Sequence, residues 1–148
     1  MAADEAIQTR FIEAVRSAFW KLFQTELERK DDPPRESEEI VFTALAGFTG
    51  SIFGIVSLRL CEHTAVAALN KHKHVMESSD SPLLAEVEEL IDEILQAAER
   101  PGADHLDFSL PEIISGSSYE VDFRKYRKRF EVGFDSAVGG LCLTVAYC

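Results

Sequence analysis

The chain has 148 residues, of which 46% are hydrophobic, and 26 acidic against 15 basic residues give it a formal net charge of −11. This length and hydrophobic content predict one folded domain with its own core, spanning residues 1–148, and exclude a disordered chain. The acidic balance argues against general nucleic-acid binding, which depends on neutralising phosphates with Lys and Arg, and against docking on anionic membranes.

The cysteines and the first residues indicate a cytoplasmic protein. Cys61 and Cys142 lie in apolar runs, Cys148 is the last residue, and no two cysteines are close in sequence. We therefore expect reduced thiols. The opening MAADEAIQTR is acidic and lacks the apolar run of a signal peptide. No apolar stretch reaches the roughly 18–20 residues of a membrane span, so no membrane contact is expected.

The first half of the chain predicts two helices and a hairpin. Apolar residues recur at helical spacing over 4–29. The runs 40–46 and 52–60 predict two strands, with the glycine-bounded segment 47–50 as the turn between them. Residues 62–73 predict a second helix, since alanines and a leucine recur there at helical spacing.

A third predicted helix carries no positive charge. Ser81 to Glu99 reads SPLLAEVEELIDEILQAAE, and no Lys or Arg occurs between His74 and Glu99. The apolar stripe consists of Leu83, Val87, Leu90, Ile91, Ile94 and Ala98. The acidic residues assigned to the opposite side are Glu86, Glu89, Asp92 and Glu93. Like charges three or four residues apart cost about 0.2–0.5 kcal/mol per pair. The pattern fits a solvated acidic face, or a presented site in which Glu89 and Asp92 project side by side.

After this helix, three strands are predicted, at 106–110, 119–132 and 138–147. Together with the first hairpin they indicate an α+β fold, an antiparallel sheet with helices packed on one face.

A weak internal repeat is also present. Gly47-Phe48 is followed by Gly54 at the same spacing that separates Gly133-Phe134 from Gly140. One interpretation is an ancient duplication, with one long helix beside each hairpin. The other is that two glycine-bounded hairpins resemble each other through turn chemistry alone. Both remain open.

Other candidate sites are weaker. His72 and His74 have flanking lysines that repel a cation, so a helix end is expected there instead of a metal site. His63 and His105 are isolated in the sequence. The basic run 124–129 fits a phosphate or acidic-partner patch, or a solvated edge strand or loop. The sequence contains no phosphate-binding glycine loop, no Cys-X-X-Cys and no Gly-X-Ser-X-Gly.

The order of these segments resembles the CheX/CheC family of chemotaxis phosphatases over nearly the whole chain. EAIQTRFIEAVRSAFWKLF is similar to that family's opening helix, and FTALAGFTGSIFGIVSLRL to its glycine-punctuated hairpin. CEHTAVAAL is similar to the helix that follows, and LDFSLPEIISG to the strand-and-proline segment. The resemblance implies the fold of a CheC-like protein.

The family's catalytic motif is a glutamate, two residues, then an asparagine, and Glu89-Leu90-Ile91-Asp92 stands at the matching place. The resemblance implies that Glu89 pairs with a lysine of a phosphorylated CheY-like response regulator. Asp92 stands where an asparagine would orient the attacking water. A carboxylate accepts hydrogen bonds but does not donate them, and it repels a phosphoryl group.

The function implied is binding of a phosphorylated CheY-like response regulator, with hydrolysis of its aspartyl phosphate weakened by Asp92. The metal in this family belongs to the regulator, so no cofactor or metal of the chain's own is expected. Self-association through a sheet edge is also implied, with residues 31–39 as a connecting arm. The alternative is a non-catalytic interaction or dimerisation module of the same fold.

Overall fold

The computed structural model describes residues 2–30, 41–72, 82–99, 105–116 and 122–148. These residues form three helices and seven strands. The helices are α1 (Ala2–Phe23), α2 (Glu62–His72) and α3 (Pro82–Ala98). The strands are β1 (Glu28–Lys30), β2 (Val41–Gly50), β3 (Gly54–Cys61), β4 (Leu106–Phe108), β5 (Glu112–Ser115), β6 (Lys128–Asp135) and β7 (Leu141–Tyr147).

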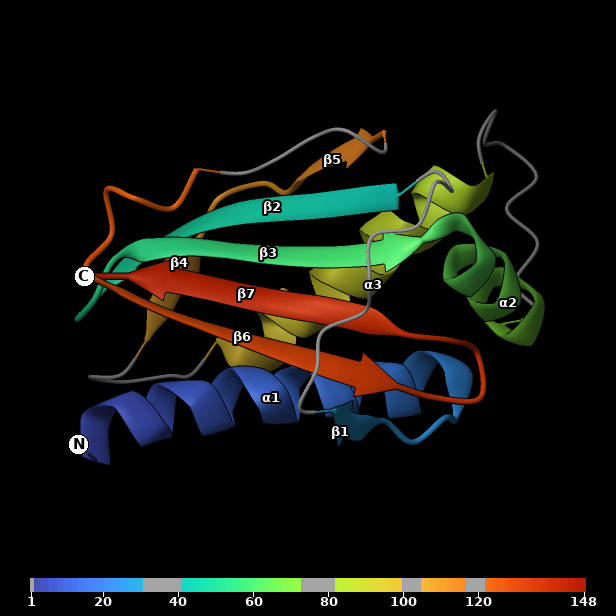
Figure 1. Cartoon of the computed structure of the whole chain (residues 1–148), viewed down its shortest axis with the longest axis horizontal. Coiled ribbons are helices and arrows are strands. Elements are labelled where there is room, and N and C mark those ends of the chain that lie inside the picture. Colours follow the sequence, from blue (N-terminus) through green and yellow to red (C-terminus); the bar gives the residue numbers. More distant parts are fainter. Residues whose placement is uncertain (1, 31–40, 73–81, 100–104, 117–121) are drawn as a thin grey trace.

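All seven strands belong to one antiparallel sheet in the order β1-β6-β7-β3-β2-β4, with β5 also paired to β2. In Figure 1, α1 and α3 lie behind the sheet, and α2 lies at one end of it. The predicted α+β class, with helices packed on one face of an antiparallel sheet, is therefore confirmed.

The core lies between the sheet and the two long helices. Its largest fully buried apolar side chains are Phe11, Phe19, Phe23, Leu58, Leu90, Ile91, Ile94, Leu106, Phe134, Leu141 and Leu143. Along β3 and β7 the core side chains Val56, Leu58, Leu60, Leu141, Leu143 and Val145 alternate with those of the other face, of which Ser57, Thr144 and Ala146 are also buried. No helix in the described part of the chain is long and apolar enough to cross a membrane.

The first helix ends six residues earlier than predicted. Gln24 adopts a positive φ of 51°, a conformation that stops a helix, and the Thr25 hydroxyl donates a hydrogen bond to the Phe23 carbonyl. The next residues form β1, whose Arg29 pairs with Phe134 of β6. Strand pairing with a distant segment ends the helical pattern here, and periodicity alone does not reveal that pairing.

The predicted turn at residues 47–50 is wrong, because these residues lie inside β2. Gly47 pairs with Ile55 on one side, and residues 48–50 pair with β4 on the other. The chain instead reverses at residues 51–53. A Cβ at Gly50 would lie 2.9 Å from Leu106 Cδ2, so this glycine permits close approach of β4.

The two glycine-phenylalanine hairpins occupy corresponding elements, β2-β3 and β6-β7, which lie next to each other through the β3-β7 pairing. Their registers differ by one residue. Gly47 pairs with Ile55, eight residues on, whereas Gly133 pairs with Cys142, nine residues on. The glycines of the two hairpins therefore do not occupy equivalent positions in the sheet, although their spacing in the sequence is identical. Duplication remains a prediction that the arrangement of the two hairpins favours.

The last third of the chain differs in detail from the prediction. The segment after α3 forms two short strands, β4 and β5, instead of one. The strand predicted at 119–132 begins only at Lys128; residues 119–121 lie outside the described part. Residues 122–127 form no strand because Asp122 accepts hydrogen bonds from the backbone and side chain of Arg124. The basic run 124–129 is therefore a turn followed by the first two residues of β6, and all but the half-buried Tyr126 are exposed, which agrees with the solvated loop or edge strand.

Candidate functional site

The candidate site lies on α3, whose sequence fixes which side faces the core. Pro82 stands at the first helical position, where its missing N–H costs nothing. The predicted apolar stripe is confirmed: Val87, Leu90, Ile91, Ile94 and Ala98 are buried and Leu83 is half-buried. Burial of this stripe holds the helix on the sheet, so its other side remains available for binding.

One acidic residue was assigned to the wrong side of the helix. Glu86 is only 2% exposed, whereas the sequence interpretation placed it on the polar face. The position follows from helical geometry, since Glu86 comes three residues after Leu83 and four before Leu90, so it lies on the buried stripe. The acidic face therefore consists of Glu88, Glu89, Asp92 and Glu93, and this set is called the acidic face below.

Two contacts with α1 fix the position of α3. The buried Arg10 side chain donates a hydrogen bond from Nε to the Ala98 carbonyl, satisfying one of the carbonyls left open where the helix ends. Nearer the middle, Lys21 Nζ lies 3.2 Å from Glu93 Oε2. These contacts, together with the packing of α3 against α1, give the acidic face a defined orientation on the fold, which suits a group that must position a partner.

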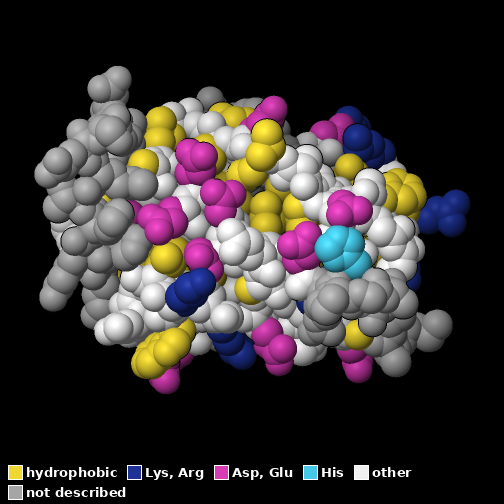
Figure 2. All heavy atoms as spheres, turned by 180° about the vertical axis from the view of Figure 1, so that it is seen from behind, with side chains coloured by type: hydrophobic (Ala, Val, Ile, Leu, Met, Phe, Trp, Pro, Cys, Tyr) yellow, Lys and Arg dark blue, Asp and Glu magenta, His cyan; other side chains and the backbone are white. Residues whose placement is uncertain are grey.

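Glu89 and Asp92 lie three residues apart on α3, and the structure makes both half-buried. The expectation of solvent exposure is thus only partly met, while the neighbours Leu90, Ile91 and Ile94 are buried as predicted. Partial burial raises the pKa of Asp92, and the negative charges of Glu88, Glu89 and Glu93 raise it further. Figure 2 shows acidic side chains gathered on the helix side of the molecule, with hydrophobic atoms exposed beside them.

Chemically, this arrangement is an acceptor surface. Ionised carboxylates accept hydrogen bonds and attract a cation, and the raised pKa of Asp92 brings its neutral form closer to physiological pH. A neutral carboxyl group donates one hydrogen bond as well as accepting others. The acidic face can therefore bind a lysine of a partner, and Asp92 gains a donor when it is protonated.

A second cluster was missed by the sequence interpretation, which treated His105 as isolated. His105 Nε2 lies 2.9 Å from Asp107 Oδ1 and 3.7 Å from Glu99 Oε1, and three ligand atoms of these residues fall within 4.8 Å of one another. Alternation along the strand predicts that His105 and Asp107 share a side, but only the fold brings Glu99 to them. The hydrogen bond between His105 and Asp107 explains their proximity.

The remaining candidates of the sequence interpretation add nothing to the site. His63 is exposed on α2, and His72 ends that helix as expected. Residues 73 and 74 lie outside the described part of the chain.

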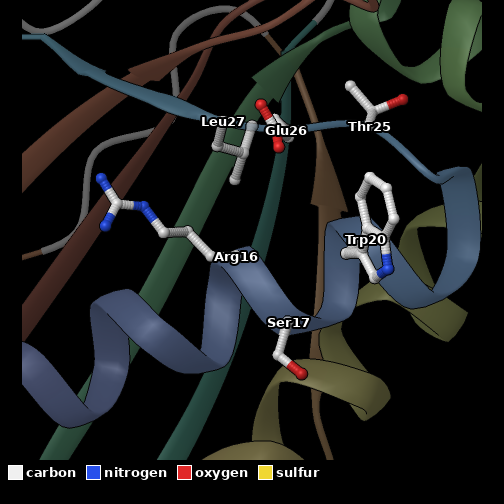
Figure 3. Close-up of a pocket in the computed structure, with 6 residues that line it drawn as sticks. All are labelled: Arg16, Ser17, Trp20, Thr25, Glu26 and Leu27. Atoms are coloured by element: carbon white, nitrogen blue, oxygen red, sulfur yellow. The ribbon is translucent and has the colours of Figure 1, made fainter.

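An open groove of about 380 Å³ lies between α1 and the segment that follows it (Figure 3). Its lining residues are Arg16, Ser17, Trp20, Thr25, Glu26 and Leu27. None of these residues belongs to α3, so the groove is separate from the acidic face.

Comparison with solved structures identifies the class of fold. The chain has the CheC-like fold seen in CheX and related chemotaxis proteins. It matches the chemotaxis protein CheX from Vibrio vulnificus with a TM-score of 0.78 and 16% identity, covering 96% of each chain. A CheC-like superfamily protein from Shewanella sp. PV-4 matches with a TM-score of 0.78 and 18% identity, over 96% of this chain and 97% of that one.

A third match is the CheX–CheY–BeF3–Mg²⁺ complex from Borrelia burgdorferi, with a TM-score of 0.66 and 16% identity over 94% of this chain and 96% of that one. No protein-family model matches the sequence, and no curated protein matches it. At these identities the property shared with the solved structures is the fold.

Proposed function

We propose that this protein binds the phosphorylated receiver domain of a CheY-like response regulator through the acidic face of α3. The observation that carries the proposal is the pair Glu89 and Asp92, three residues apart on a helix that packs against α1 in a CheX-like fold. The related complex of CheX with CheY supports the choice of partner. Glu89 binds a lysine of the receiver, and Asp92 lies against the phosphoryl group.

Hydrolysis of the aspartyl phosphate is part of the proposal, with a low rate. An amide at this position would both accept and donate hydrogen bonds while it orients a water molecule in line with phosphorus, whereas an ionised Asp92 only accepts them. Its charge also repels the phosphoryl group. We therefore expect binding to be well developed and catalysis to be slow.

The test is to add the protein to phosphorylated CheY-type receivers of the same organism and to follow both complex formation and phosphate release. Binding together with a small acceleration over the receiver's own decay supports the proposal. Binding without acceleration favours the non-catalytic interaction module. The absence of both refutes the proposed function.

A further inference from the structure

Leu110 is the most exposed large hydrophobic side chain among the described residues. Its exposed fraction is 90%, against 57% for Trp20, 56% for Phe53 and 39% for Val66. Burying a leucine side chain is worth about 1.5–3 kcal/mol, so leaving one almost wholly in water forgoes that stabilisation.

The exposure of Leu110 does not come from a loose loop. The preceding residue, Ser109, forms two hydrogen bonds with Gly47 of β2. Its N–H donates to the Gly47 carbonyl at 2.9 Å, and its hydroxyl accepts from the Gly47 N–H at 2.9 Å. Pro111 follows, with a fixed φ that also restricts the residue before it. The side chain is thus presented from a defined backbone, which lowers the entropy that a partner must overcome.

The position of Leu110 places it at the sheet edge nearest α3. β5 pairs with residues 42–45 of β2 and β4 pairs with residues 48–50, so Leu110 lies in the gap between two strands on one edge. Both β2 and β5 pack against α3, the helix that carries the acidic face. Pro111, which follows Leu110, and Ile114 are half-buried, whereas Ile113 packs against the core and Glu112 is exposed.

We propose that Leu110 is the apolar anchor of the surface by which this protein docks on a receiver domain, beside the acidic face. The inference rests on the proposed function. Charged groups steer and orient a partner, whereas affinity comes largely from a desolvated apolar centre, which the acidic face lacks. The occupant is a receiver surface with a lysine next to an apolar depression, the complement of an acidic face beside a rigid leucine.

The test compares Leu110→Ala and Leu110→Asp with the wild type and with Phe53→Ala. Phe53 is an exposed hydrophobic residue in the turn between β2 and β3 and serves as the matched control. The probe is a CheY-type receiver of the same organism activated with BeF3⁻ and Mg²⁺, and its dissociation constant is measured by calorimetry. We expect Leu110→Ala to weaken binding about tenfold and Leu110→Asp more strongly. Phe53→Ala should bind as the wild type does, and all melting temperatures should agree within a few degrees.

Three outcomes overturn the inference. If Leu110→Ala binds as tightly as wild type while Glu89→Ala binds more weakly, the acidic face docks without the leucine and the proposed function stands. If Leu110→Asp converts a dimer into a monomer by sedimentation and leaves receiver binding unchanged, Leu110 belongs to an interface between two copies of this chain. If the wild type itself binds no receiver, the proposed function fails and the anchor fails with it.

Discussion

Replacing Asp92 by Asn should increase the rate at which this protein dephosphorylates a cognate receiver. The substitution keeps the size and branching of the side chain and its half-buried place on α3. It changes two properties: the amide gains an N–H donor, and the unit of negative charge beside the phosphoryl group is lost.

The magnitude follows from these two changes. One net hydrogen bond contributes about 0.5–1.5 kcal/mol. Removing a like charge a few ångströms from the phosphoryl group contributes about 1–2 kcal/mol at a site that still contacts water. The sum, about 1.5–3.5 kcal/mol of activation free energy, corresponds to a roughly ten- to several-hundredfold faster rate.

The rate advantage of Asp92→Asn over wild type should depend on pH, and the environment of Asp92 fixes the direction of that dependence. Partial burial and the charges of Glu88, Glu89 and Glu93 raise the pKa of Asp92. On α1, Lys21 pairs with Glu93 at 3.2 Å and not with Asp92. As the pH falls toward the raised pKa, neutral Asp92 becomes more abundant and resembles the amide. The advantage of Asp92→Asn should therefore shrink at low pH.

The same shift makes a stability prediction that needs no partner. The raised pKa means that the folded state binds the Asp92 proton more tightly than the unfolded chain does. The protonated carboxyl group therefore contributes stability that is fully present below the unfolded pKa. This stability is lost as the pH rises through the folded pKa. Asp92→Asn should thus gain stability relative to wild type as the pH rises toward neutrality. Urea unfolding at several pH values measures this difference.

Phosphate release from the receiver is the decisive assay, with Glu13→Gln as the matched control. Glu13 is an exposed residue of α1 outside the acidic face, and its substitution removes the same charge. We expect Asp92→Asn to be fast and Glu13→Gln to stay near wild type. Equal acceleration by both variants would mean that bulk charge, and not position, is responsible. A slower Asp92→Asn would show that the carboxylate works as a base and that the reasoning above is wrong.

Three further predictions concern binding, thiol chemistry and packing. Glu89→Ala should weaken receiver binding about tenfold or more, measured by calorimetry, and an unchanged affinity would remove Glu89 from the interface. Cys142 should resist iodoacetamide in the native protein at pH 8.5, because burial and the adjacent Glu131 raise the pKa of its thiol to about 12; mass spectrometry showing labelling before unfolding would contradict this. Gly54→Ala should destabilise by about 1–3 kcal/mol or more in urea unfolding, since its Cβ would meet the Ala146 carbonyl oxygen and approach Tyr147 Cα to 2.8 Å. Gly47→Ala, with open contacts of 3.7 Å, should change stability by less than about 1 kcal/mol.

The elements that could be predicted are those whose signal is local. The amphipathic stripe of α3 and the alternation along β3 and β7 are written in residues that lie close together in the sequence. The errors occurred where distant segments decide. The pairing of β1 with β6 ends α1 early, and the pairing of β4 with β2 keeps residues 48–50 extended. Neither partner can be identified from the segment itself.

The candidate site divides in the same way. Glu89 and Asp92 could be placed on one helix face from their spacing alone, and Glu86 could have been excluded by the same rule. Leu110 could not be identified as a presented residue, because its conformation depends on hydrogen bonds between Ser109 and Gly47, sixty-two residues apart. The grouping of Glu99 with His105 likewise depends on where the end of α3 meets the start of β4.

The acidic face breaks a local rule, and this is itself an argument about function. Glu88 with Asp92, Glu89 with Asp92 and Glu89 with Glu93 are like-charge pairs at helical spacing, each costing about 0.2–0.5 kcal/mol. The Lys21–Glu93 contact offsets one of these charges, and burial together with the charges of Glu88, Glu89 and Glu93 raises the pKa of Asp92. A helix selected for stability alone would carry lysines here. Unfavourable charge retained on a partly buried surface is expected where a partner neutralises it, and a lysine of a docked receiver would do so.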